Sequence, residues 1–245
     1  MPETSRVNSI ESCCLTALRR LAISMLVPAV VYCLLAFLIG GIPFGYVTGL
    51  LVLGDDIRKH GSGNIGATNV WRVLGWKCGL LVLLLDALKG LVPTALSEIA
   101  LRFSGQTPPE WLMVAAGLSA IAGHMFPVWL RFRGGKGVAT ALGVVLVISP
   151  KSSGLALVAF IVAMLASRMV SLSSIVAALA YAAAHLWLGG ELVWTSRGLP
   201  ATMFALIVPT LIIWRHRGNI RRILNGTESR FGRSAKPTGP PSADR

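Results

Sequence analysis

The chain has 245 residues, of which 54% are hydrophobic and only 13% are charged, and its formal net charge is +13. Soluble domains carry about 25% charged residues, so this composition excludes an ordinary soluble domain and predicts an integral membrane protein. The length suits several spanning helices of about 20 residues with their loops, without room for a soluble domain of typical size. We therefore expect one membrane domain.

Seven apolar blocks follow one another along the chain, separated by short polar, charged or Gly/Pro-rich joints. They cover residues 25–53, 78–101, 111–129, 137–149, 154–167, 172–190 and 199–214. Blocks such as "GLLVLLLDALKGLV" lack the alternation of a membrane β-barrel, so the predicted fold is all-α, a polytopic bundle of about seven transmembrane helices. Residues 137–149 and 154–167 are shorter than the roughly 17 residues of a span, which leaves half-spans, a single hairpin and a five-span count open.

Positive charge lies mostly on one side if these segments alternate across the membrane. That side receives Arg58, Lys59, Arg72, Lys77, Arg131, Arg133, Lys136, Arg168 and eight cations from Arg215 onward, whereas the other receives Arg102, Lys151 and Arg197. The positive-inside rule then predicts a cytoplasmic C-terminus, with the segment before the first span outside. Arg19 and Arg20, just before the first span, argue for the opposite orientation.

The two ends of the chain differ from the membrane domain, which we place at residues 25–230. Residues 1–24 are expected to be a dispensable or disordered extension or the result of an overlong start-site choice, because Met25 opens the apolar stretch. Residues 231–245 are rich in Pro, Ser and Gly and are predicted to be a disordered tail. The net charge of +13 is assigned to loops facing anionic lipid headgroups and not to nucleic acid, since no nucleic-acid module is present.

The unusual polar residues gather on the predicted cytoplasmic side. They combine what a phosphate group needs: glycines that allow close approach of backbone N–H groups, small hydroxyls and amides, and fixed positive charge. The residues concerned are Ser62, Gly63, Asn64, Thr68, Asn69 and Arg72, then Gly134, Gly135, Lys136 and Gly137, then His216 and Asn219. Taken alone, a GGKG stretch is a turn with a headgroup-facing lysine, and His216 is an interfacial side chain. Their coincidence on one side favours an anion site.

Asp86 and Lys89 lie three residues apart within the block 78–101. At this spacing they can neutralise each other on one helix face. Ionisable residues inside a span are nevertheless costly enough to count as functional candidates. The four cysteines show no metal-ligand spacing and no three-ligand pattern of a catalytic ion is visible, so neither a metal nor another cofactor is expected.

Five stretches carry a resemblance to a known family: "HGSGNIGATNVWR", "LDALKG", "GHMFPVWLRFRGGKGVAT", "SRMVSLSSI" and "RHRGNIRRILNGTE", in this order. They resemble the bacterial acyl-phosphate-dependent glycerol-3-phosphate acyltransferases, the PlsY family, over roughly residues 27–230. The resemblance implies a multi-pass enzyme of the bacterial inner membrane, with seven transmembrane helices and a cytoplasmic active site. Such an enzyme transfers a fatty acyl group from acyl phosphate to the 1-position of glycerol 3-phosphate, giving lysophosphatidic acid and phosphate. It also implies contact with membrane lipid and a functional link to the enzyme that makes acyl phosphate.

The resemblance implies roles for individual residues. His216, Asn219, Lys136 and Arg72 are the expected catalytic group, and Ser62, Gly63, Asn64 and Thr68 line the place where phosphate is held. Lys136 corresponds to a phosphate-binding lysine, and His124, Phe126 and Pro127 correspond to the segment leading into it. Ser171 and Glu228 correspond to further site residues, although Ser173 and Ser174 leave the alignment of Ser171 open.

The expected chemistry needs mainly positioning, because an acyl phosphate already has a good leaving group. No Ser-His-Asp arrangement is visible, so we expect direct attack by the glycerol hydroxyl, with His216 or a substrate phosphate oxygen accepting its proton. The acyl chain is expected in a hydrophobic groove between helices. Two alternatives remain: an anion transporter that uses Asp86 and Lys89, and a related transferase whose acyl donor is carried on coenzyme A or a carrier protein.

Overall fold

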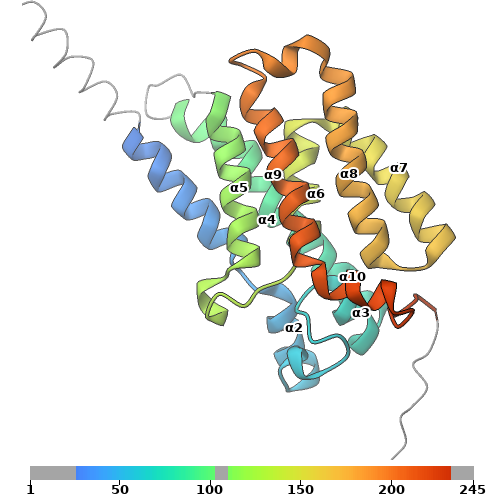
Figure 1. The fold of residues 1–245 in the computed structure, drawn as a ribbon. Helices are drawn as coiled ribbons and strands as arrows, with labels where there is room; N and C mark the ends of the chain where they lie inside the picture. The colour runs from blue at the N-terminus through green and yellow to red at the C-terminus, as the bar shows by residue number, and fades with distance from the viewer. Residues whose placement is uncertain (1–25, 103–109, 233–245) are drawn as a thin grey trace, which may run out of the picture.

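The computed structural model describes residues 26–102 and 110–232, and every regular element in these two ranges is a helix (Figure 1). The predicted N-terminal extension, residues 1–24, lies outside the described residues, as do residues 233–245 of the predicted tail. Residues 231 and 232, which the sequence assigns to the tail, are described: the Phe231 N–H donates a 2.6 Å hydrogen bond to the Arg168 carbonyl, and the Phe231 ring contacts Trp71.

The helices follow the predicted apolar blocks, with short helices between them. A helix over residues 26–40 precedes α2 (Phe44–Leu53), α3 (Ala67–Leu74), α4 (Trp76–Arg102), α5 (Glu110–Met125), α6 (Val138–Ile148), α7 (Pro150–Ser167), α8 (Val170–Gly189), α9 (Leu199–Arg215) and α10 (Arg217–Leu224). Three short 3-10 turns join them: Ile57–Lys59, Val128–Leu130 and Gly190–Trp194.

Five helical segments within the described ranges are long and apolar enough to cross a membrane, and α9 with α10, bent by 58°, would make a sixth. The five are Leu26–Leu53, Trp76–Ser97, Trp111–Leu130, Pro150–Ser167 and Val170–Trp194. The predicted helical membrane protein is therefore confirmed. The count of seven remains a prediction, because α6 has only 11 residues.

The two short apolar blocks have different outcomes. The block predicted at 154–167 begins earlier, at Pro150, which occupies the first turn of α7 where its missing N–H costs nothing, and the helix reaches 18 residues. By contrast, α6 stays at 11 residues and rises about 16 Å, roughly half the thickness of a bilayer core. It is surrounded by the other helices, since Ala141, Val144 and Val145 belong to the main hydrophobic core.

Small residues let α4 and α6 touch backbone to backbone. A Cβ added to Gly143 would lie 2.0 Å from the Ala87 carbonyl oxygen, and one added to Gly90 would lie 2.2 Å from that of Thr140. Close approach through small residues is the usual way in which membrane helices gain packing contacts. The contact fixes α6 against α4, which also carries Asp86 and Lys89.

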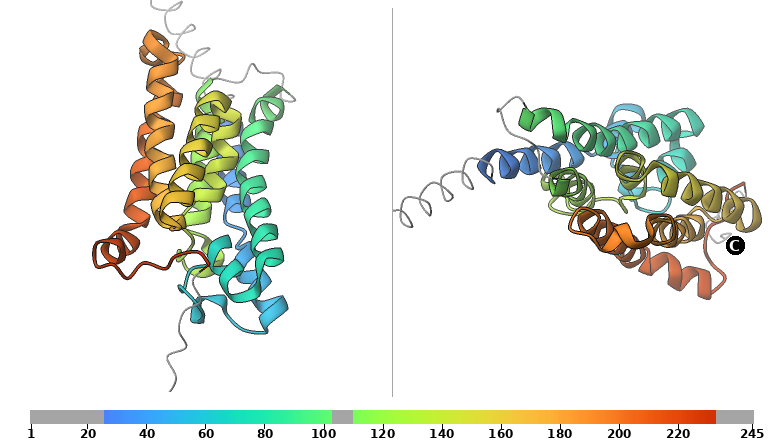
Figure 2. Two further views of the ribbon diagram at one scale, coloured as in Figure 1. Left: turned by 90° about the vertical axis from the view of Figure 1, so that its right-hand side faces the viewer. Right: turned by 90° about the horizontal axis from the view of Figure 1, so that it is seen from above.

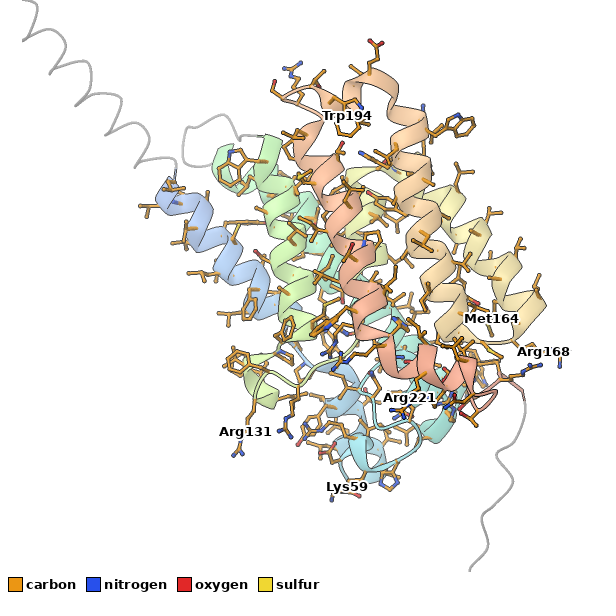
Figure 3. The ribbon with its side chains drawn as sticks, viewed as in Figure 1. Lys59, Arg131, Met164, Arg168, Trp194 and Arg221 are labelled. Atoms are coloured by element: carbon orange, nitrogen blue, oxygen red, sulfur yellow. The ribbon has the colours of Figure 1, made fainter. Side chains whose placement is uncertain are left out.

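Several positively charged residues lie at one end of the bundle. Lys59, Arg131, Arg168 and Arg221 lie at the same end, and Trp194 lies at the opposite end (Figure 3). The helices α2, α3 and α10 also lie at that first end, as two further views show (Figures 1 and 2). We call it the cationic end; it is the end to which the sequence assigned the phosphate-binding motifs.

Candidate active site

The first motif forms a loop that is held together by Asn69. Asn69, 2% exposed at the start of α3, accepts a 2.7 Å hydrogen bond from the Ser62 N–H through Oδ1. Its Nδ2 donates to the carbonyl oxygens of Ile57, His60 and Asn64 at 2.8–3.3 Å. The whole amide is therefore engaged with the loop backbone, so that Asn69 shapes the loop that presents its neighbours.

The other residues of the first motif line the outer side of this loop. Ser62 and Gly63 are exposed, and Gly63 has a φ of +72°, a value that glycine adopts without strain. Thr68 lies in the first turn of α3, where helical N–H groups lack partners within the helix. The Asn64 side-chain oxygen accepts a 2.8 Å hydrogen bond from the Gly66 N–H, which forms a turn immediately before that helix. Arg72 is exposed in the last turn.

Two cations of the same loop are already paired. Arg58 makes a 2.7 Å ion pair with Asp56, and Lys59 makes one of the same length with Asp55. These hydrogen bonds hold the pKa of both carboxyl groups below the usual value. The positive charges of Arg58 and Lys59 are thus largely balanced within the loop, whereas the charge of Arg72 acts on Lys136.

Residues 134–137, which we call the glycine loop, form the last part of the connection from α5 to α6 and are held from two sides. The N–H groups of Gly134 and Gly135 donate to the carbonyl oxygens of Met125 and His124, each at 3.2 Å. On the other side the Arg215 guanidinium donates to both glycine carbonyl oxygens at 2.6–3.0 Å. The predicted anion cradle of glycine N–H groups is therefore not present at these two residues, because their N–H groups are used inside the protein.

Gly137 has a different role from its two neighbours. It caps α6 with a φ of +80°, and a Cβ there would lie 2.6 Å from the Met125 side chain. Both ends of the glycine loop therefore contact the last turn of α5, through Gly134 and Gly135 at one end and Gly137 at the other. What it presents toward the cationic end is the side chain of Lys136.

Lys136 begins a chain of hydrogen bonds that joins three distant parts of the sequence. Its Nζ donates to Asn219 Oδ1 at 2.5 Å, and Asn219 Nδ2 donates to Glu228 Oε1 at 2.6 Å. The same carboxylate oxygen accepts a 2.6 Å bond from the Ser171 hydroxyl, and Oε2 accepts a 2.7 Å bond from Arg222. The stretch that contains Lys136, the stretch that contains Asn219, and the start of α8 thus meet at Glu228.

The three neighbouring serines at the start of α8 differ in where their hydroxyl groups donate. The hydroxyls of Ser173 and Ser174 donate to the carbonyl oxygens of Met169 and Val170, one turn back on their own helix. Ser171, 5% exposed, donates across to Glu228 instead. Among these three serines, Ser171 is the one that faces the network.

Electrostatics around Lys136 favour the binding of an anion. Burial, together with the charges of Arg222, Arg215 and Arg72, lowers the pKa of Lys136 to about 8 against the opposing effect of Glu228. Burial would raise the pKa of Glu228, but hydrogen bonds from Ser171, Asn219 and Arg222 outweigh it and leave the pKa lowered. Lys136 therefore sits in an excess of positive charge that a phosphate group would relieve.

His216 occupies the bend between α9 and α10 and is 2% exposed. Its Nδ1 lies 2.8 Å from the Ile212 carbonyl oxygen, which can only accept, so the proton is on Nδ1 and Nε2 carries the lone pair. Burial and the nearby charge of Lys136 lower the pKa of His216 to about 4. The ring is therefore neutral at physiological pH and can accept a proton at Nε2.

Sequence reasoning missed the parts played by two arginines. It treated Arg215 and Arg222 as ordinary interfacial charges, whereas Arg215 holds the glycine loop and Arg222 holds Glu228. The available signal was their position near His216 and Asn219 in the sequence: Arg215 ends α9 and Arg222 lies on the short helix α10. Within residues 26–102 and 110–232, no three His, Cys, Asp or Glu side chains group as metal ligands would.

These features define a helical integral membrane protein with a hydrogen-bonded cationic centre at one end of its bundle. A sequence model described as glycerol-3-phosphate acyltransferase matches residues 30–226. The chain belongs to the glycerol-3-phosphate acyltransferase family, which confirms the resemblance noted in its motifs.

Similar proteins cover most of the chain. A glycerol-3-phosphate acyltransferase of Myxococcus xanthus is 44% identical over 198 residues, which are 81% of this chain and 97% of that protein. The corresponding protein of Geobacillus kaustophilus is 45% identical over 195 residues, 80% of this chain and 92% of its own.

Two solved structures share the fold. A crystal structure of PlsY, described as an integral membrane glycerol 3-phosphate acyltransferase in its glycerol 3-phosphate form, superposes with a TM-score of 0.73 at 41% identity, covering 83% of this chain and 96% of that chain. A lysophosphatidic acid form of PlsY gives a TM-score of 0.70 at 40% identity, covering 83% and 95%.

Proposed function

We propose that this chain transfers a fatty acyl group from acyl phosphate to the 1-hydroxyl of glycerol 3-phosphate, giving lysophosphatidic acid and phosphate. The observation that carries the proposal is the network of Lys136, Asn219, Glu228 and Ser171, placed beside His216 and within the field of Arg72. Both substrates carry phosphate, and this centre concentrates positive charge in a partly buried place. The two PlsY structures, described with glycerol 3-phosphate and with lysophosphatidic acid, correspond to a substrate and a product of that reaction.

The proposed reaction is a direct displacement. The glycerol hydroxyl oxygen forms a bond to the acyl carbon, the bond from that carbon to the phosphate oxygen breaks, and phosphate leaves with the electron pair. Lys136 and Arg72 neutralise the charge on the phosphate groups, and Asn219, fixed by Glu228, orients Lys136. Holding the hydroxyl against the acyl carbon supplies much of the rate enhancement.

His216 is the residue that we assign to the proton of the attacking hydroxyl. Its Nε2 is an acceptor because Nδ1 is committed to the Ile212 carbonyl. A pKa of about 4 makes it a weak base, so the proton passes on to the departing phosphate, which is the stronger base. This assignment leaves no acyl-enzyme intermediate.

The remaining predicted residues divide into three roles. Ser62 and Gly63, which are exposed, and Asn64 and Thr68, which are partly exposed, are proposed to contact a substrate phosphate through hydroxyl, amide and backbone groups. Asn69, Gly134, Gly135 and Gly137 are proposed to shape the two loops, since their polar groups or their space are taken up within the protein. Ser171 and Glu228 are proposed to support Asn219.

We also propose that the cationic end faces the cytoplasm of a bacterial inner membrane. The distribution of Lys and Arg between the two ends supports this orientation through the positive-inside rule. A cytoplasmic centre has access to glycerol 3-phosphate and to the product of the enzyme that makes acyl phosphate, which accounts for the expected functional link.

The full chain in mild detergent, supplied with palmitoyl phosphate and glycerol 3-phosphate, tests the reaction. We expect phosphate and lysophosphatidic acid in equal amounts with this donor and neither product with palmitoyl coenzyme A. Lys136→Ala and Arg72→Ala should abolish turnover, while each variant elutes and melts as the wild type does.

Turnover with palmitoyl coenzyme A would overturn the assignment of the acyl donor. Folded protein that gives no product would overturn the assignment as an acyltransferase. An acyl group trapped on the protein with palmitoyl phosphate alone would exclude direct displacement.

A further inference from the structure

We propose that Asp86, Lys89 and His124 form a buried cluster that positions the glycine loop, and with it Lys136, for phosphate binding. Lys89 Nζ lies 2.7 Å from Asp86 Oδ1, and His124 Nδ1 lies 3.7 Å from the same oxygen. The three residues are 2%, 4% and 4% exposed, respectively. The inference rests on the proposed function in that it assigns these residues to the binding step of that reaction.

The cluster reaches the glycine loop through His124. The His124 carbonyl oxygen accepts the Gly135 N–H at 3.2 Å, and a Cβ added to Gly135 would lie 2.2 Å from His124 Nε2. The imidazole ring therefore forms the surface on which Gly135 rests. One residue further along the chain, Lys136 turns toward Asn219.

Lys89 connects the cluster to a second part of the fold. Its Nζ donates a 2.7 Å hydrogen bond to the Ile42 carbonyl oxygen, in the break between the helix over residues 26–40 and α2, and lies over the Phe44 ring. Lys89 and Asp86 thus connect α4 to the helix break before α2. His124 lies on α5 and connects α4 to α5 and to the glycine loop. Two helices and one loop depend on the same carboxylate.

Stability alone does not account for the cluster. A buried ion pair contributes little over well-packed apolar residues of similar size, because the loss of hydration offsets the attraction between the charges. Nδ1 of His124 has no hydrogen-bond partner in the described residues. Asp86 Oδ1 lies 3.7 Å from it, which is too far for a hydrogen bond. The arrangement is better explained by the orientation that it imposes on His124 and Gly135.

Three variants of the full chain separate positioning from folding. Asp86→Asn keeps the shape of the side chain but removes the charge opposite His124. The double variant Asp86→Asn with Lys89→Met also removes the unpaired cation, so it should recover thermal stability. Gly135→Ala adds a methyl group that must move the loop and the His124 ring apart, while Asp86 and Lys89 are kept. The matched control is Ser97→Ala, which removes a buried hydroxyl on the same helix, 11 residues further along.

Hydrogen exchange of a peptide covering residues 131–137 is the primary measurement. The N–H groups of Gly134 and Gly135 are hydrogen-bonded in the protein, so exchange should quicken at least tenfold in Asp86→Asn, in the double variant and in Gly135→Ala, but not in Ser97→Ala. In the same variants KM for glycerol 3-phosphate should rise roughly tenfold to hundredfold, with a smaller change in kcat.

The outcomes are distinct. Unchanged loop exchange and unchanged KM in the double variant would overturn the inference and leave the cluster as a support for the fold alone. Raised exchange and KM together with restored melting behaviour would establish it. If the wild type makes no lysophosphatidic acid, the proposed function fails, but the exchange comparison still decides whether the cluster positions the loop.

Discussion

Glu228 is a single carboxylate that organises several side chains from different helices. Ser171 from α8, Asn219 and Arg222 from α10 all donate to it, and Asn219 carries the connection on to Lys136. An amide side chain has a donor end and an acceptor end, so the carboxylate determines which end of Asn219 faces the lysine. The identity of one residue thereby fixes the orientation of another.

Changing Glu228 to Gln should weaken the enzyme without unfolding it. The variant removes the ion pair with Arg222 and the charge that raises the pKa of Lys136, so kcat/KM should fall about tenfold to hundredfold. Steady-state kinetics at pH 7 measures this loss. Arg217→Gln is the control, because Arg217 lies on the same helix over the Trp214 ring. Equal losses in both variants would speak against a specific role of Glu228.

The pH dependence of kcat/KM for glycerol 3-phosphate should reflect the ionisation of Lys136. Because burial lowers its pKa to about 8, the lysine is charged below that pH and loses its charge as the pH rises through it, so kcat/KM should fall above pH 8. In Glu228→Gln the decline should begin at a lower pH, since the charge that supports the lysine is gone. Activity that stays constant from pH 7 to pH 10 would contradict the assignment of Lys136.

At the scale of elements, the contact between α4 and α6 determines where the glycine loop begins. Gly143 lies against the backbone of Ala87, one residue after Asp86. The helix that carries the buried cluster and the helix that starts at the loop are therefore held at a fixed separation. Any side chain at this contact would move the loop relative to the cluster.

Gly143→Ala should lower thermal stability, because a methyl group would meet the Ala87 carbonyl oxygen at 2.0 Å and force the two helices apart. The cost of such overpacking is about 1–3 kcal/mol. Thermal unfolding in detergent measures the shift in Tm. Gly154→Ala on α7 is the matched control, because a Cβ there meets nothing within 4 Å. A Tm of Gly143→Ala equal to that of the control would refute the close contact.

Composition and apolar blocks were sufficient to predict most of the helices, because burial in a bilayer requires long uninterrupted apolar segments. Patterns of this kind do not reveal helix breaks or lengths that depend on packing. The first block, 25–53, is interrupted ahead of α2, where Pro43 lacks a backbone N–H, and α6 remains short because its glycine loop enters the bundle.

The sequence predicted that the candidate residues gather at one end of the bundle, but it did not predict their hydrogen-bond partners. The motifs place Lys136, His216 and Asn219 at one end, as the structure finds them. Hydrogen-bond partners depend on three-dimensional distances that spacing along the chain does not contain. For that reason the binding of Arg215 to the glycine carbonyls, and the use of Asn69 within its own loop, became visible only in the structure.

At the scale of the whole molecule, the two ends differ in charge, and the proposed orientation follows from that difference. In a variant without its native cysteines, Lys59→Cys at the cationic end should react with a membrane-impermeant maleimide in inside-out vesicles only. Glu191→Cys, in the 3-10 turn beside Trp194 at the opposite end, should react in right-side-out vesicles only (Figure 3). The reverse pattern would place the candidate site outside the cytoplasm.

The depth of the glycine loop affects how the enzyme should respond to ionic strength. The loop rests on His124, which faces Asp86, ten residues or about 15 Å along α4 from Trp76. Salt screens charges in solvent over about 8–10 Å but has much less effect on partly buried ones. Raising sodium chloride from 50 to 500 mM should therefore change KM for glycerol 3-phosphate less than about twofold in steady-state assays, and a much larger increase would indicate a superficial site. A cell could then alter its internal salt during osmotic stress without slowing the first acylation of its membrane lipids.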